Sequence, residues 1–87
     1  MVKILHVIKE HGDTIALDII KAQGKIRNLA VLLIHDGVLD HDLVVPGITI
    51  YAARADIEAR GIETDIVLLD YSEIVDMIFG SNRVICW

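Results

Sequence analysis

Five short apolar runs, rich in β-branched residues, recur along this 87-residue chain and limit what it can fold into. They span residues 2–8, 29–34, 48–52, 65–69 and 84–87. The first two are apolar almost without interruption, which is typical of strands covered on both faces of a parallel sheet. Each run therefore predicts one strand of a largely buried sheet.

An amphipathic pattern follows the first run. Residues 13–23 place polar side chains at spacings of three and four, with isoleucine and alanine between them. This spacing is typical of a helix with one wet stripe and one buried stripe. Asp13 is predicted to cap its N-terminus, and Gly24 to end it.

Two further helices are predicted, at residues 53–60 and 71–79. Asp70 and Glu73 have the spacing of a capping box at the start of the second of these. The stretch 38–45 fits either a short helical turn or a loop. The apolar face of the last helix is expected to contain Tyr71, Ile74, Val75 and Ile78.

Strands that alternate with helices throughout a chain predict right-handed crossovers. The expected class is α/β: three layers, with a mostly parallel sheet of about five strands and helices on both faces. The expected organisation is a single domain over residues 1–87. Sites in such sheets form outside the carboxyl ends of the strands, which here are residues 9–13, 35–37, 53–54 and Asp70.

The proportion of apolar residues predicts an oligomer. A chain of 87 residues buries only about 64% of its surface on folding, yet 54% of these residues are hydrophobic. Part of this excess must lie on the outside, where it favours contact with other subunits.

Charge, cysteine content and motifs exclude several classes. Eight Lys and Arg stand against 13 Asp and Glu, without a basic cluster, so direct nucleic-acid binding is not expected. Cys86 is the single cysteine, which fits a reducing compartment. The longest run without charge, 43–53, is too short to span a bilayer. No glycine-rich phosphate-binding motif occurs. We expect a cytoplasmic protein without a cofactor or membrane contact.

The histidines near the strand ends are the first candidates for chemistry. His35 and Asp36 follow a predicted strand, and His11 and His41 could lie near them, so a metal site or an acid–base pair is one interpretation. The simpler interpretation is turn chemistry with surface side chains. His6, inside the first strand, is interpreted as a hydrogen-bonded structural residue.

The C-terminal residues supply two more candidates. Cys86 is the only soft nucleophile, but Arg83 is its nearest charge in the sequence, so an inert or interface thiol is the simpler interpretation. Trp87 is expected to pack on its own helices or on a partner, because an exposed indole is costly. Tyr71 is the second expected anchor of packing or of an interface.

Several blocks of the sequence resemble the TusB/DsrH family of sulfur-relay proteins. Residues 65–76, Asp-Ile-Val-Leu-Leu-Asp-Tyr-Ser-Glu-Ile-Val-Asp, with the final Trp87, are similar to that family's strand, Asp-Tyr cap, helix and terminal Trp. Residues 32–38 are similar to its Leu-Leu-Gln-Asp-Gly-Val, with His35 in place of Gln. Residues 50–61 are similar to its Val-Tyr-Ala and Asp-Leu-x-Ala-Arg-Gly.

The resemblance implies a DsrE-like, flavodoxin-related fold and a place in a hetero-oligomer with TusC-like and TusD-like chains, or with DsrF and DsrE counterparts. It implies a persulfide relay, either for 2-thiolation of the wobble uridine in tRNA or for oxidative sulfur metabolism. The active cysteine of that family belongs to the TusD/DsrE-type chain, and in some DsrH chains also to the first helix. Residues 13–23 contain no cysteine, so no catalytic residue is carried over.

Three hypotheses follow. The leading one is a non-catalytic subunit of a sulfurtransferase complex. The second is a stand-alone homo-oligomer that carries sulfur on Cys86, because the segments after Gly37 and Gly61 are shorter than is typical of the family. The third is a metal-binding module at His35, Asp36 and His41.

Overall fold

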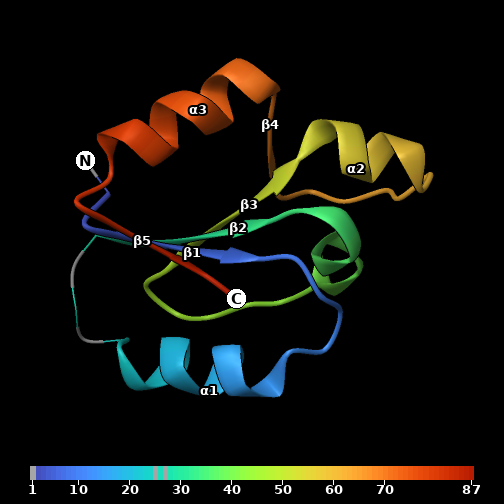
Figure 1. Cartoon of the computed structure of the whole chain (residues 1–87). Helices are drawn as coiled ribbons and strands as arrows, with labels where there is room; N and C mark the ends of the chain where they lie inside the picture. The colour runs from blue at the N-terminus through green and yellow to red at the C-terminus, as the bar shows by residue number, and fades with distance from the viewer. Residues whose placement is uncertain (1, 25, 27) are drawn as a thin grey trace.

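The computed structural model describes residues 2–24, 26 and 28–87, which form a parallel sheet flanked by helices (Figure 1). The strands are β1 (Ile4–Ile8), β2 (Leu29–Leu33), β3 (Thr49–Ala53), β4 (Val67–Leu69) and β5 (Arg83–Cys86). The helices are α1 (Thr14–Ala22), the 3₁₀ helix η1 (His35–Asp40), α2 (Arg54–Ala59) and α3 (Tyr71–Gly80). No helix in these described ranges is long and apolar enough to cross a membrane. The predicted α/β class is confirmed.

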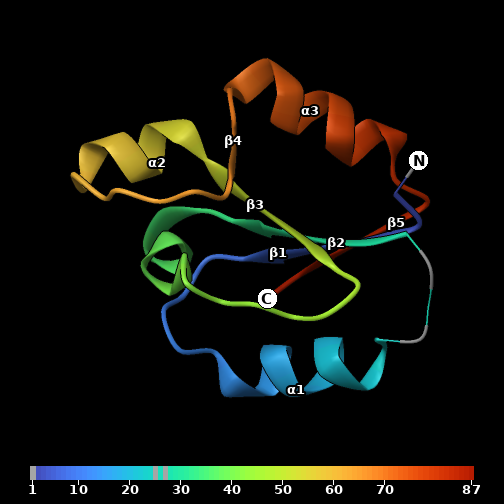
Figure 2. The same cartoon turned by 180° about the vertical axis from the view of Figure 1, so that it is seen from behind.

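The order of the strands decides where the helices lie. In the described part of the chain the order is β4-β3-β2-β1-β5, and all neighbouring pairs are parallel. The chain adds β2, β3 and β4 on one side of β1 and then crosses to its other side to form β5. Right-handed crossovers in opposite directions place their helices on opposite faces. Figures 1 and 2 accordingly show α1 and α3 on opposite sides of the sheet.

Both long helices begin where the sequence predicts. The side chain of Asp13 accepts a hydrogen bond of 3.0 Å from the backbone N–H of Ala16, which satisfies a free donor in the first turn of α1. Asp70 and Glu73 form the predicted capping box of α3, in which Glu73 Oε1 accepts from the Asp70 N–H at 3.0 Å. These local signals fix the two helix starts before any tertiary contact is considered.

Alternation along the strands divides the core into two clusters. On the face that α1 covers, which we call the α1 face, the described buried residues are Ile8, Ala16, Ile20, Leu29, Val31, Leu33, Val38, Val45, Ile48, Ile50, Ala52 and Ile57. On the opposite side, the α3 face, they are Leu5, Val7, Ala30, Leu32 and Leu69. Helix α2, through Ile57, and η1, through Val38, both pack into the larger cluster, so the two faces are covered unequally.

The predicted buried stripe of α3 is partly wrong. Tyr71 and Ile78 are exposed, whereas Ile74 and Met77 pack against the cluster of the α3 face. Of the predicted stripe, Ile74 packs against this cluster, and Met77 joins it from outside the stripe. The ambiguous stretch 38–45 resolves into the end of η1 followed by irregular chain.

Candidate functional site

The parallel sheet brings the carboxyl ends of its strands to one edge. At this edge Asp40 links two of the loops that follow the strands. Its Oδ2 accepts a hydrogen bond of 2.9 Å from the backbone N–H of Gly12, in the loop after β1. Its Oδ1 lies 2.6 Å from His11 Nδ1. His11 therefore lies beside η1, as the sequence allows, and its partner is a single carboxylate.

The start of η1 packs tightly onto the end of β1. The Ile34 N–H donates to the Ile8 carbonyl at 3.0 Å, and Gly37 is buried over the same carbonyl. A Cβ on residue 37 would lie 2.2 Å from the Ile8 oxygen, so only glycine fits. His35 takes up the turn with φ of 49°, a left-handed conformation that is uncommon for a residue other than glycine.

The side chains of α2 hold the residues that follow β2. The His35 backbone N–H donates to Asp56 Oδ2 at 2.9 Å. Arg60 Nη2 donates to Asp36 Oδ1 at 2.9 Å, and Arg60 Nη1 lies 3.5 Å from Asp56 Oδ1. Asp36 and Asp56 therefore link η1 to α2. This arrangement agrees with the simpler interpretation of residues 35–37, a turn with surface side chains.

The proposed metal set is not brought together. Within residues 2–24, 26 and 28–87, no group of three His, Cys, Asp or Glu side chains is arranged to hold a metal ion. The Asp36 carboxylate faces Arg60, and the His35 ring lies 4.0 Å from Asp56. The hypothesis of a metal module at His35, Asp36 and His41 therefore lacks the geometry that it needs.

A small hollow of about 290 Å³ opens where β2, β3 and β4 end. Its walls are mostly apolar, and beside it Arg54 Nε donates to Asp70 Oδ1 at 2.8 Å, which links the ends of β3 and β4. Sites of α/β folds form at such strand ends. The lining residues are Ile34, His35, Ala53, Ala55, Asp56, Leu69, Tyr71 and Ile74.

Cys86 lies at the carboxyl end of the edge strand β5, opposite Val7 of β1. Its thiol is free and exposed. Exposure of the thiol is one requirement for a persulfide carrier.

Trp87 extends the pairing of β5 and completes a partly buried chain of hydrogen bonds. Its backbone N–H donates to the Val7 carbonyl at 2.9 Å, and its indole Nε1–H donates to His6 Nδ1 at 3.1 Å. The two rings stack with centroids 6.1 Å apart. Because Nδ1 accepts, the proton of the neutral His6 ring is on Nε2, which donates to Gln23 Oε1 at 2.7 Å.

The hydrogen bonds that join Gln23, His6 and Trp87 explain how a histidine can be buried in β1. His6 is fully buried, and both of its ring nitrogens have partners. The bonds connect β1 to the C-cap residue of α1 and to the last residue of the chain. Sequence reasoning predicted a structural role for His6 but missed its partners, since Trp87 is 81 positions away.

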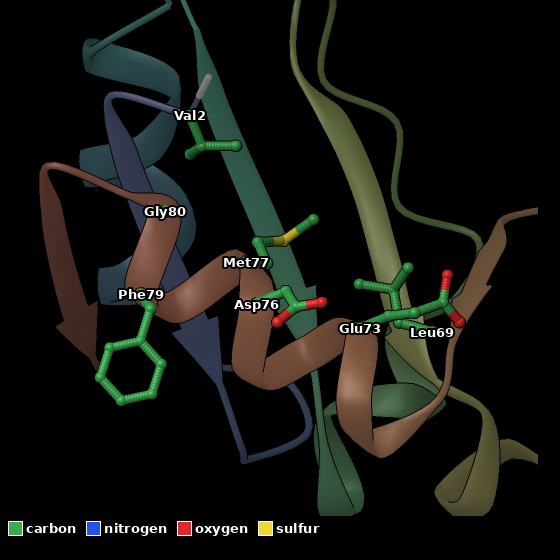
Figure 3. Close-up of a pocket in the computed structure, with 7 residues that line it drawn as sticks. All are labelled: Val2, Leu69, Glu73, Asp76, Met77, Phe79 and Gly80. Carbon is green, nitrogen blue, oxygen red and sulfur yellow. The ribbon is translucent and has the colours of Figure 1, made fainter.

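Helix α3 exposes aromatic side chains beside a hollow on its face of the sheet. Phe79 is 86% exposed and Tyr71 is 83% exposed, and no residue of α3 is classed as buried among those described. Tyr71 is therefore not an anchor of packing within the chain. A shallow groove of about 690 Å³ runs beside the helix (Figure 3), lined by Val2, Leu69, Glu73, Asp76, Met77, Phe79 and Gly80.

Comparison with known proteins adds one finding. No protein-family model matches the chain, and no curated protein matches it either. Among solved structures, the chain is similar to protein Tm0979 from Thermotoga maritima, determined by NMR in solution, with a TM-score of 0.64 and 24% identity. The match covers 87% of this chain and 92% of that one. It shows a shared fold.

Proposed function

We propose that this chain is a non-catalytic subunit of a sulfurtransferase complex of the TusBCD or DsrEFH kind, in a cytoplasmic persulfide relay. The observation that carries the proposal is the open α3 face. A helix that alone covers one side of a sheet normally buries a continuous stripe. Here α3 leaves an aromatic ring at each end exposed: Phe79 lines the open groove, and Tyr71 lines the smaller hollow at the strand ends. Such a surface is typical of a subunit contact.

The sequence supports the sulfur-relay part of the proposal. The ordered resemblance to the TusB/DsrH family covers nearly the whole chain, and the parallel α/β fold is the one that the resemblance implies. Helix α1 contains no cysteine at the place where some DsrH chains carry one. The reactive sulfur of the proposed complex therefore belongs to a partner of the TusD or DsrE type.

Co-purification tests the proposal. The tagged chain, expressed at its native level, is recovered under mild conditions and its partners are identified by mass spectrometry. We expect DsrE-like and DsrF-like chains with the wild type and with Ile15→Ser, which removes an exposed isoleucine from α1. We expect their loss with Phe79→Ser. Recovery of a stable, partner-free chain that has transferase turnover of its own would contradict the proposal.

The pathway is tested separately. Wobble-uridine 2-thiolation is the proposed destination of the sulfur, and oxidative sulfur metabolism is the alternative. Deletion of the gene followed by nucleoside analysis of total tRNA is expected to show loss of 2-thiouridine. Unchanged 2-thiouridine together with impaired sulfur oxidation would favour the alternative. In either case the chain is not proposed to touch tRNA itself, since its net charge is −5.

Cys86 supports a second candidate function, a homo-oligomeric sulfur carrier, because its thiol is exposed at a strand end. In the step concerned, the Cys86 thiolate attacks the outer sulfur of a donor persulfide, the donor S–S bond breaks, and the donor leaves as a thiolate. Incubation with a persulfide donor and measurement of the intact mass tests this. Addition of one sulfur atom to the wild type but not to Cys86→Ser would support it; no addition to the wild type, or equal addition to both proteins, would exclude it.

A further inference from the structure

The groove on the α3 face has an apolar floor and an acidic edge. Val2, Leu69 and Met77 supply the apolar part, and Glu73 and Asp76 are the charged residues of the lining. Figure 3 shows Met77 directed to the side of α3 where Val2 lies, and Phe79 directed to the other side of the helix. A protein segment seated here would contact apolar atoms and two carboxylates together.

We infer that the α3 face binds a partner segment whose apolar side chains are flanked by lysine or arginine, most simply a basic amphipathic helix. This inference rests on the proposed function and adds the chemistry of the partner surface. Carboxylates that lose water without gaining a counter-charge oppose binding. Helix α3 itself has no lysine or arginine, and the groove lining has none, so the cations must come from the partner.

Charge argues against a second copy of this chain as the occupant. Asp76 lies near the middle of α3, so a two-fold axis across the helix would set the two Asp76 carboxylates against each other. Each copy also has a net charge of −5, which raises the repulsion between copies. A basic partner meets the same surface with attraction, and this also discriminates against self-association.

The two acidic groups lie along one edge of the apolar groove, where they add charge specificity to the site. The Glu73 carboxylate is positioned by its hydrogen bond to the Asp70 N–H. Asp76 is one turn further along the same helix, at the i,i+3 spacing that places the two on one side. A partner helix with two cations one turn apart can therefore face both carboxylates while its apolar stripe enters the groove.

Peptide titration of the full-length chain, followed by NMR of its backbone amides, tests the inference. The probe is a synthetic amphipathic helix with a leucine stripe flanked by lysines. One control peptide has glutamate in place of lysine, and the other keeps the lysines but has serine in place of leucine. We expect only the probe to shift the amides of residue 2 and residues 69–80.

Charge reversal supplies the matched variants. Glu73→Lys with Asp76→Lys is expected to weaken probe binding about tenfold. Asp18→Lys with Glu58→Lys changes exposed acids on α1 and α2, gives the same net charge, and is expected to leave the affinity within about twofold. Equal weakening by both pairs, equal binding of the three peptides, or shifts confined to other surfaces would each overturn the inference.

Sedimentation of the wild type separates the inference from the alternative occupant and from the proposed function. A monomer is expected at micromolar concentration, and a dimer that Phe79→Ser dissociates would overturn the inference in favour of a second copy. Probe binding that charge reversal abolishes, together with native partners unrelated to sulfur transfer, would leave the docking chemistry intact and reject the relay.

Discussion

The two faces of the sheet differ in how completely they are covered. The α1 face holds twelve of the described buried core residues, contributed by strands, α1, η1, α2 and the segment between η1 and β3, together with the hydrogen bonds of His6. The α3 face holds five, and its single helix leaves Phe79 and Tyr71 in solvent. The α1 face therefore contributes most of the stability. The α3 face presents a surface that is open to contact with another protein.

In the described part of this chain, more elements cover the α1 face than the α3 face. Small domains hide a modest fraction of their surface, so covering one face fully leaves little chain for the other. In the proposed complex, a partner would cover the apolar surface that α3 leaves open.

The largest difference is expected for core isoleucines. Ile20→Ala empties a fully buried site between α1 and the sheet and should lower the free energy of unfolding by about 3–4 kcal/mol. Ile78→Ala, at an exposed position of α3, should lower the free energy of unfolding by less than about 1 kcal/mol. Urea denaturation followed by far-UV circular dichroism measures both, and equal losses would remove the distinction between the faces.

Two glycines offer the next comparison. Gly37→Ala places a methyl group against the Ile8 carbonyl, so we expect a loss of about 3 kcal/mol. Gly80→Ala, at the end of α3, meets no atom within 4 Å and should be neutral or stabilise by about 0.5 kcal/mol. Thermal melts of the two variants decide this, and a harmless Gly37→Ala would show that η1 is not closely packed on β1.

A smaller effect is expected from the hydrogen bond of the terminal indole. Trp87→Phe keeps much of the apolar contact but removes the donor to His6 Nδ1, and the buried acceptor left alone should lower stability by about 1.5 kcal/mol. Circular dichroism is the suitable probe because Trp87 is the only tryptophan. Unchanged stability would mean that the bond contributes nothing, and that Trp87 acts by packing alone.

The smallest change in stability is expected on the open face. Phe79→Ser should alter the free energy of unfolding by no more than about 0.5 kcal/mol, because the ring is almost fully exposed. This result would allow loss of partners in co-purification to be interpreted as loss of contact. A destabilisation as large as that of Ile20→Ala would instead show that the ring packs within the chain.

The sequence predicts the elements well because their signals are local. The apolar runs, the Asp13 cap and the Asp70–Glu73 box each act within a few residues, and the structure confirms them. The order of the strands is not local. The position of β5 beside β1 depends on the reversal of the last crossover, which no residue of the sequence encodes by itself.

The candidate sites were less predictable for the same reason. The bond between Trp87 and His6 requires β5 to lie beside β1, and the anchoring of Asp36 by Arg60 requires α2 to lie beside η1. The apolar stripe of α3 is only partly buried, because the position of the helix on the sheet brings Ile74 and Met77, and not Tyr71 or Ile78, against the core. Pattern gives the period of a helix, whereas packing decides which of two adjacent stripes is buried.

The most direct test compares hydrogen exchange in the isolated chain and in the complex recovered from the native source. Exchange in the complex is expected to slow across α3 and around Val2, just before β1, while α1 is unchanged. Slowing that is confined to α1, or recovery of the native chain as a monomer with no partner, would contradict this expectation.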